Sequence, residues 1–361
     1  MQTYDTAIIG AGPAGLSAAI AAAEMGAGVA LIERNNRIGG QLIKQTHPFF
    51  GSEKQYASYR GIHIPDILGL RLKELDNVQI MLDTKVQGYY PDDGVLGLEN
   101  GSSFFPVKAE KIIVATGASE KTLAFPNNDL PGVYGAGAVQ TLMNVHGVIP
   151  GRRVLMVGSG NIGLIVGYQL MQAGVELASV IEAAPHIGGY LVHASKLRRM
   201  GVPILTSHTI TSAYGHKEVE GATICRLDNQ WQPVSGTERD VKVDTICVSV
   251  GLSPMADILW QMGCQMRYVP QLGGHVPLRN EKMQTTVDGV FVAGDVASVE
   301  EASSAMMEGR IAGLAAAESL GCQSAELKAQ QQDAWEELKS LRSGPVGEKI
   351  RAGIHNLTLE V

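Results

Sequence analysis

The sequence predicts an α/β fold in which two Rossmann-like, three-layer dinucleotide-binding domains share one chain. A strand, a Gly-x-Gly-x-x-Gly turn, a helix and a second strand ending in an acid occur in that order from residue 6 and again from residue 153. This order is typical of folds that hold a dinucleotide at a helix N-terminus. Hydrophobic residues fill 45% of the 361 positions, which is enough for a buried core in each domain.

The first repeat opens the chain. Residues 6–9 are predicted to form a short buried strand, Gly10–Gly15 form the turn, and an alanine-rich helix continues to about Glu24. A second strand, residues 28–32, ends on Glu33. In the turn, the first glycine allows the sharp bend, the second lets the backbone approach a pyrophosphate, and the third lets the helix pack on the sheet. Glu33 is placed to accept hydrogen bonds from the ribose hydroxyls of an adenosine.

The second repeat has the same parts. Residues 153–157 form a strand, Gly158–Gly163 a glycine turn, residues 164–173 a helix, and residues 177–181 a strand that ends on Glu182. A Gly-Gly doublet follows the acid at the same spacing in both repeats. A duplicated dinucleotide-binding unit accounts for this similarity better than chance.

Glu182 favours NAD over NADP as the second nucleotide. It is followed by Ala183 and Ala184 rather than by arginines, and a carboxylate repels a 2′-phosphate. The alternative is a solvated acid at the end of a strand, in a unit that has lost its nucleotide.

Composition excludes several function classes. The net charge of −7 argues against nucleic acid as a partner, because phosphate binding needs a basic face. The four cysteines lie too far apart in sequence for a zinc ribbon, a closely spaced redox dithiol or a disulfide framework, so no metal site is predicted. Without an apolar stretch of about 18 residues or a basic leader, we expect no membrane span and a cytoplasmic location.

The C-terminal third carries a third motif. Residues 285–295 read as a strand that runs into Gly294-Asp295, and Glu300-Glu301-Ala302 then precedes a helix of small residues. Together with Val114-Ala115-Thr116-Gly117, these motifs resemble the two-dinucleotide-domain flavoproteins, the class that includes thioredoxin reductase. The resemblance implies that the first repeat binds FAD and that the second binds NAD(P)H. It also implies that the NAD-type domain (121–251) is inserted into an FAD domain (1–120 and 252–325), with a helical tail (326–361).

The resemblance also assigns individual residues. The residues expected to contact FAD are Gly10, Gly12, Pro13, Ala14, Gly15, Glu33, Arg34, Gly40, Gln41, Thr116, Gly117, Gly294, Asp295, Glu301 and Ala302. Those expected to contact NAD(H) are Gly158, Gly160, Asn161, Ile162, Gly163 and Glu182. Lys44 is a candidate to stabilise reduced flavin, with a solvated loop lysine as the alternative. No residue is assigned a role in acid–base or nucleophilic chemistry, because hydride transfer between cofactors needs mainly stacking and orientation.

A narrower resemblance follows from Ala115–Glu120, Leu130–Val133 and Ala136–Leu142. These segments look like the flavoprotein α-subunits of amine dehydrogenase and oxidase complexes, such as opine oxidase, sarcosine oxidase, hydrogen cyanide synthase and proline dehydrogenase. The resemblance implies a hetero-oligomer with a second flavoprotein or a small iron–sulfur protein, and an amine substrate on the partner. Longer members hold a cluster in a cysteine-rich extension. Here only Cys322 follows Cys264, so the ligands of any cluster are expected on another polypeptide.

Several alternatives remain open from the sequence. The chain is a free-standing NADH:acceptor oxidoreductase, a flavin-holding scaffold without catalysis of its own, or one component of such a complex. The aromatic stretch from Phe49 to Arg60 is either a lid or a partner-facing loop, and the helical segment 330–342 packs on its own chain or on a partner. Glu300 and Glu301 either pair with a helix dipole or tune the flavin potential. The last stretch, from residue 344, has glycine breaks and little periodicity.

Overall fold

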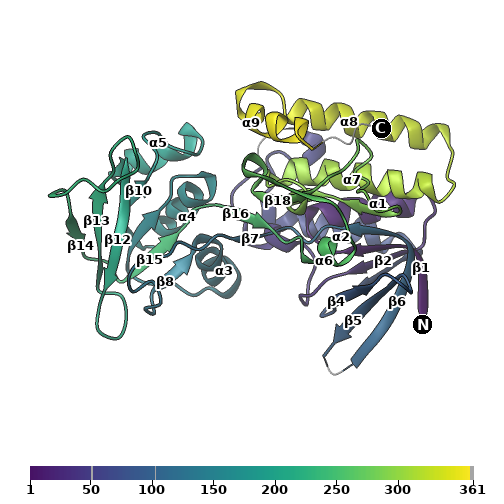
Figure 1. The fold of residues 1–361 in the computed structure, drawn as a ribbon, viewed down its shortest axis with the longest axis horizontal. Helices are drawn as coiled ribbons and strands as arrows, with labels where there is room; N and C mark the ends of the chain where they lie inside the picture. The colour runs from purple at the N-terminus through teal and green to yellow at the C-terminus, as the bar shows by residue number, and fades with distance from the viewer. Residues whose placement is uncertain (50–51, 102, 358–361) are drawn as a thin grey trace. The chain divides into compact units, whose positions relative to one another are not determined.

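The chain forms two compact units in a computed structural model that describes residues 1–49, 52–101 and 103–357 (Figure 1). Unit 1 combines Met1–Ser119 with Ser253–Val361, and unit 2 is Glu120–Leu252. The two crossings between the units, β7 (Ala118–Glu120) and β16 (Leu252–Pro254), pair with each other. Unit 2 is therefore an insertion in the sequence of unit 1.

Unit 1 is built on a seven-stranded sheet. Its order is β3 (Val78–Met81), β2 (Val29–Ile32), β1 (Gln2–Ile9), β6 (Ser103–Val114), β5 (Val95–Asn100) and β4 (Lys85–Tyr90), with β19 (Val290–Val292) also paired to β6. Strands β3, β2, β1, β6 and β19 are parallel, whereas β5 and β4 continue the sheet as an antiparallel meander. Ile9 is in register with Ile32 and with Val114, which is in register with Val292. The carboxyl ends of these strands therefore lie at the same edge of the sheet. The residues that follow them there are those of the first glycine turn, Glu33, Ala115 and Gly294.

Alternation along the central strands gives the sheet two buried faces, and hence three layers. Ile8, Leu31 and Ile113 share one core with residues of α1 (Pro13–Glu24), α2 (Ile64–Lys73), α7 (Ala302–Ser319) and α8 (Ala325–Leu341). These helices form the helical layer of unit 1 (Figure 1). Their neighbours Ala7 and Ile112 contact the other face, where residues of the meander and of α6 (Asp257–Gln261) complete a second core. This arrangement confirms the predicted α/β class.

The contact between α1 and α7 depends on missing side chains. A methyl group on Gly309 would lie 2.0 Å from the carbonyl oxygen of Ala14, and one on Gly313 would lie 2.4 Å from that of Ala18. The two helices can approach this closely only because both α7 positions are glycine. The small residues noted in the sequence therefore set the spacing of the helical layer.

The C-terminal helices pack on their own unit. Leu327, Ala334 and Leu338 of α8 are at most 1% exposed, and Ala334 and Leu338 join the core that α7 shares. Of the two alternatives for the segment 330–342, the structure therefore shows packing on its own chain. A helix, α9 (Gly344–His355), follows where the sequence shows little periodicity; it forms where Leu357 enters a small core with Leu272.

Unit 2 repeats the central plan of unit 1. Its parallel sheet has the order β11 (Ile204–Thr206), β10 (Glu176–Glu182), β9 (Arg153–Val157), β15 (Thr245–Val248) and β8 (Val133–Gly135). Helices α3 (Ala136–His146), α4 (Asn161–Gln172) and α5 (Leu191–Arg199) pack with it in one core, and β12 (His208–Tyr214), β13 (Gly221–Arg226) and β14 (Arg239–Val241) form an antiparallel sheet.

Two element boundaries differ from the prediction. Helix α4 begins at Asn161, three residues before the predicted start, because the glycine turn itself forms the first helical turn. The predicted strand 285–295 is mostly a turn, in which the amide of Thr285 donates to Val290 and its hydroxyl accepts from the amide of Val287. Only Val290–Val292 remain as strand β19.

None of the helices in the part of the chain that the structure describes has both the length and the apolar character of a membrane-crossing segment.

Candidate functional site

The first glycine turn leaves open space at one glycine only. A methyl group on Gly10 would lie 2.4 Å from the carbonyl oxygen of Ala115, and one on Gly15 would lie 1.8 Å from that of Gly10. At Gly12 the nearest heavy atom would be 3.9 Å away, at Gly40. The outer glycines are therefore required by close backbone packing. The middle glycine instead leaves an open cradle that a side chain would fill. A diphosphate needs such close access to the backbone.

The start of α1 faces this cradle. Gly12 is the N-cap of the helix and Pro13 is its first residue, and no described side chain caps the exposed amides. Uncapped amides and the helix dipole together favour an anion. Gly40 lies against Gly12 and opens η1 (Gly40–Lys44), so the predicted Gly-Gly doublet is part of the same corner.

The Glu33 side chain is hydrogen-bonded to the glycine turn. The side chain is 5% exposed; Oε2 accepts from the amide of Ala11 at 2.9 Å, and Oε1 accepts from the amide and side chain of Asn35 at 2.9 and 2.6 Å. A carboxylate has about four acceptor sites. Capacity therefore remains for a ribose hydroxyl, in an orientation that the turn fixes. Arg34 and Gln41 are exposed.

The Gly294-Asp295 motif lies beside the same helix. Gly294 has φ +78°, and a methyl group on it would lie 2.9 Å from Cβ of Ala14. Asp295 follows in η5 (Gly294–Val296) and accepts from the amide of Glu300 at 3.2 Å. Burial raises the pKa of Asp295 to about 7, and repulsion from Glu308 and Glu300 adds to the effect. The structure thus brings together two motifs that are about 280 residues apart.

The remaining residues predicted for the first site lie on two other segments. Thr116 donates to the carbonyl oxygen of Met255 at 2.7 Å, and Gly117 accepts from the amide of Met255 at 2.9 Å. Glu301 is exposed at the N-cap of α7, and Ala302 opens that helix. Lys44 is partly buried at the end of η1.

The glycine turn of unit 2 also has two crowded outer glycines and an open middle one. Methyl groups on Gly158 and Gly163 would lie 2.1 and 2.3 Å from backbone oxygens, whereas one on Gly160 would meet no atom within 4 Å. Glu182 accepts from the amide and hydroxyl of Ser159 at 2.9 and 2.7 Å. Asn161, the first residue of α4, also accepts from the amide of Tyr190 at 2.8 Å, next to the second Gly-Gly doublet. Ile162 is 38% exposed.

A family model described as pyridine nucleotide-disulphide oxidoreductase matches residues 4–309. The chain belongs to this family. It is accordingly a FAD-dependent oxidoreductase, and the two glycine turns lie within the matched residues.

Several known proteins are similar to this chain. An opine oxidase subunit of Agrobacterium tumefaciens is 26% identical over 327 residues, which cover 87% of this chain and 65% of that protein. Hydrogen cyanide synthase subunit HcnB of Pseudomonas protegens is 26% identical over 364 residues, covering 93% and 75%. The crystal structure of thioredoxin reductase from T. acidophilum has the same fold, with a TM-score of 0.72 at 22% identity over 89% of this chain and 99% of that one. The chain thus spans about two thirds of the length of the opine oxidase subunit.

The disulphide in the family's name has no counterpart in the cysteines of this chain. Cys225, Cys247, Cys264 and Cys322 are all free, and the first three are buried. Burial raises the pKa of the Cys247 thiol, and it does the same for Cys225 and Cys264. Thiols with raised pKa are poor nucleophiles. Within the described residues, no group of three or more histidine, cysteine, aspartate or glutamate side chains is arranged to hold a metal.

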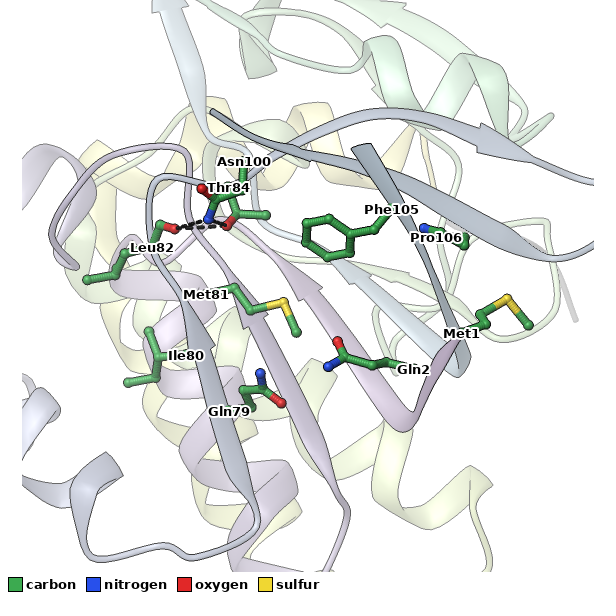
Figure 2. Close-up of a pocket in the computed structure, with 10 residues that line it drawn as sticks. All are labelled: Met1, Gln2, Gln79, Ile80, Met81, Leu82, Thr84, Asn100, Phe105 and Pro106. Carbon is green, nitrogen blue, oxygen red and sulfur yellow. Dashed lines mark hydrogen bonds between the residues drawn. The ribbon is translucent and has the colours of Figure 1, made fainter. Parts of the chain in front are cut away.

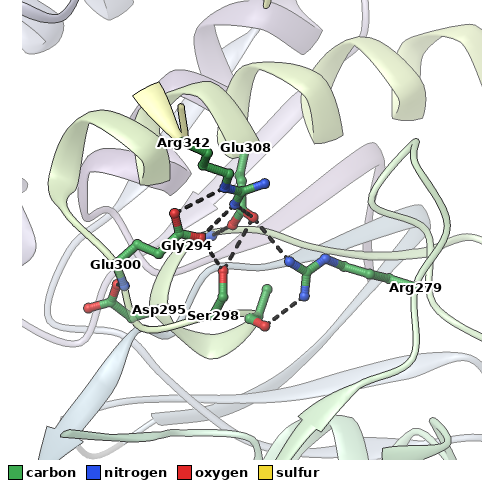
Figure 3. Close-up of polar contacts among 8 residues, drawn as sticks. Arg279, Gly294, Asp295, Ser298, Glu300, Glu308 and Arg342 are labelled. Atoms are coloured by element: carbon green, nitrogen blue, oxygen red, sulfur yellow. Dashed lines mark hydrogen bonds and ion pairs between the residues drawn. The ribbon is translucent and has the colours of Figure 1, made fainter. Parts of the chain in front are cut away.

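A buried ionic network that no sequence pattern indicates lies behind Gly294 (Figure 3). Glu308 of α7, 1% exposed, pairs with Arg279 at 3.1 Å and with Arg342 at 2.5 Å. Glu300 pairs with Arg342 at 2.6 Å, and its side chain is 7% exposed. The oppositely charged partners lie 29 to 42 positions apart in sequence, and no local pattern connects them.

A separate pocket of about 580 Å³ lies between β3 and the start of β6 (Figure 2). It is lined by Met1, Gln2, Gln79, Ile80, Met81, Leu82, Thr84, Asn100, Phe105 and Pro106. None of the predicted site residues lines it. Asn100 donates to Thr84 at 3.0 Å, so these polar groups bind each other.

Residues 50 and 51 of the aromatic stretch lie outside the described residues. The part that follows is tied to its own unit, because Lys54 pairs with Asp333 and Glu337 of α8 at 2.8 and 2.9 Å.

Proposed function

We propose that unit 1 binds FAD, that unit 2 binds NAD(H), and that the chain moves electrons between these cofactors and a partner redox protein within an amine or imino-acid dehydrogenase complex. One observation carries the proposal. Both units have a glycine turn whose middle glycine faces open space, beside a carboxylate fastened to that turn.

The FAD diphosphate would lie at Gly12, against the amides of Ala14 and Gly15 at the start of α1. Glu33 would accept hydrogen bonds from the ribose hydroxyls of the adenosine, and Arg34 would flank the adenosine. Gly40, Gln41 and Lys44 of the neighbouring η1 would lie along the cofactor. Asp295 would hydrogen-bond to a hydroxyl of the flavin side chain, because it directly follows Gly294, which packs on the start of α1. The strand end at Thr116 and Gly117 and the start of α7 at Glu301 and Ala302 would contact the rest of the cofactor.

The second dinucleotide would lie at Gly160 in the same manner, with Asn161, Ile162 and Gly163 opening α4 toward it. Glu182 would hold its ribose. Glu182 is followed by two alanines and not by arginines, and its carboxylate would repel a 2′-phosphate, so NAD(H) is favoured over NADP(H).

FAD, when bound, takes up two electrons as a hydride and passes them on. The chain's part is to hold both dinucleotides by their diphosphates and riboses, so that the reacting rings are oriented. No described acid, base or nucleophile is required for that role. The substrate's C–N bond would be oxidised on the partner, consistent with two relatives that are named as subunits.

A matched pair of variants tests the proposal. Gly12→Val fills the cradle of unit 1, and Gly160→Val fills that of unit 2. A Cβ at Gly12 would lie 3.9 Å from Gly40, and one at Gly160 would meet no atom within 4 Å, so we expect both proteins to fold. Gly12→Val should be purified without flavin. Gly160→Val should keep its flavin but lose reduction by NADH.

The outcomes separate the alternatives. If Gly12→Val retains a full complement of FAD, the assignment of unit 1 is wrong. If wild type holds FAD but ignores NADH, with or without a co-purified partner, unit 2 is a silent domain and the scaffold alternative holds. Rapid turnover of NADH with a dye by the isolated chain would favour a free-standing NADH:acceptor oxidoreductase.

A further inference from the structure

We propose that Arg342, at the end of α8, is a positioning residue for the flavin site. It acts through Glu308 and Glu300, which hold the Gly294-Asp295 turn. The inference rests on the proposed function and extends it, because the family match ends at residue 309 and Arg342 lies beyond it.

The first connection runs through Glu308. One carboxylate oxygen, Oε2, accepts from the amide of Gly294 at 2.9 Å. The other, Oε1, accepts from Arg342 at 2.5 Å and from Arg279 at 3.1 Å. Gly294 in turn packs on Ala14, at the start of the diphosphate helix. The orientation of Glu308 therefore fixes the backbone at Gly294.

The second connection runs through Glu300. Arg342 donates to both of its oxygens, at 2.6 and 3.0 Å, in a bidentate pair. The backbone amide of Glu300 donates to Asp295, and the hydroxyl of Ser298 donates to the Glu300 side chain at 2.6 Å. The Arg342 guanidinium thus contacts Glu300 directly and is linked to Gly294 through Glu308 (Figure 3).

The charge balance explains why Arg342 is needed. Two guanidiniums, of Arg279 and Arg342, face the carboxylates of Glu300 and Glu308, and all four side chains are less than 10% exposed. Burial alone would lower the pKa of Arg342, but attraction by Glu308 and Glu300 raises it overall. Without Arg342, two buried carboxylates beside Asp295 would share Arg279 alone. Uncompensated buried charge is strongly unfavourable, so the segment would rearrange.

The chain supplies a matched control for α8. Arg310 of α7 pairs with Asp333 of α8 at 2.7 Å, and these side chains are 26% and 40% exposed. This pair joins the same two helices but does not contact the Gly294-Asp295 turn. Loss of Arg310 therefore tests whether any weakening of the α7–α8 contact affects the flavin.

The experiment measures the FAD dissociation constant of apoprotein reconstituted with FAD. We expect Arg342→Met to weaken binding about tenfold or more, as displaced supporting groups do. Arg342→Lys should restore part of the affinity, and Arg310→Met should bind FAD like wild type. The double variant Glu300→Gln/Arg342→Met leaves Glu308 paired with Arg279 and should bind FAD more tightly than Arg342→Met alone. A purely structural role of Arg342 would not give this rescue.

Several results would overturn the inference. They are wild-type affinity in Arg342→Met, an equal loss in Arg310→Met, and no rescue by Glu300→Gln. If Arg342→Met does not fold, Arg342→Lys carries the comparison, and wild-type FAD affinity in Arg342→Lys refutes the inference. A wild-type chain that binds no FAD refutes the proposed function instead, and the Gly12→Val variant distinguishes the two failures.

Discussion

Glu308 should be among the most costly side chains of unit 1 to remove. Its carboxylate is 1% exposed, pairs with Arg279 and Arg342, and accepts from the amide of Gly294. Removing one member of a buried ion pair costs about 3–5 kcal/mol, because the remaining charge is left without compensation. Here the Arg279 guanidinium loses its only carboxylate partner among the described residues and the Gly294 amide loses its acceptor, while Arg342 keeps Glu300. We therefore expect Glu308→Ala to lower the free energy of unfolding of unit 1 by about 4 kcal/mol.

The assay is urea unfolding of the apoprotein followed by tryptophan fluorescence. The chain has three tryptophans, and Trp231, which is 59% exposed, is the one in unit 2. In a Trp231→Phe background, the signal from Trp260 and Trp335 reports unit 1 alone. This separation matters because a chain of two units need not unfold in a single step.

An exposed ion pair serves as the control. Lys282 and Glu318 also lie 2.8 Å apart in unit 1, but their side chains are 57% and 29% exposed. Lys282→Met should cost no more than about 1 kcal/mol. Glu308→Gln, which keeps an acceptor for Gly294, should fall between the two. If Glu308→Ala is no more destabilising than Lys282→Met, the ionic network does not support the turn as argued.

Further predictions concern Asp295, Glu182 and Gly309. Burial raises the pKa of Asp295 from 3.8 to about 7 in the folded chain, so between these pH values the folded state holds a proton that the unfolded state has lost. The free energy of unfolding of the apoprotein should therefore fall by a few kcal/mol as the pH rises from about 4 to 7. Asp295→Asn should flatten that part of the pH profile. In the holoprotein, Asp295→Ala should lower the FAD occupancy without changing the cooperativity of thermal unfolding. Full FAD occupancy in this variant would contradict the role of Asp295. Glu182→Ala combined with Ala184→Arg should shift kcat/KM from NADH toward NADPH, and unchanged kinetics with both nucleotides would show that unit 2 is not a working site. Gly309→Ala would place a methyl group 2.0 Å from the carbonyl oxygen of Ala14 and should cost roughly 1–3 kcal/mol, whereas Gly160→Ala, with no atom within 4 Å, should leave stability nearly unchanged.

The glycine turns show what can be predicted from the sequence. Gly10, Gly12 and Gly15 lie within one short turn, and each conformational requirement is met by the residue type at that position. The fold class follows from the same local pattern, because a strand, a turn and a helix in this order can pack in few ways. The fastening of Glu33 to Ala11 also has a sequence signal, since an acid at the end of the second strand must lie beside the turn.

The ionic network had no such signal. Arg279, Glu308 and Arg342 are spread over 64 positions, and each looks like a surface charge when its own segment is considered alone. Their meeting depends on the close α1–α7 contact and on the return of α8 across α7, which are tertiary features. Helix α9 was likewise obscure, because Leu357 finds its partner Leu272 through packing and not through periodicity.

In the proposed function, NADH reduces an FAD held by this chain. The most direct test is an anaerobic absorbance spectrum of the purified protein before and after one equivalent of NADH. We predict flavin bands near about 370 and 450 nm, where free FAD absorbs, and prompt bleaching of the 450 nm band in wild type but not in Gly160→Val. A protein without these bands, or one whose flavin stays oxidised with NADH in wild type, would contradict the account.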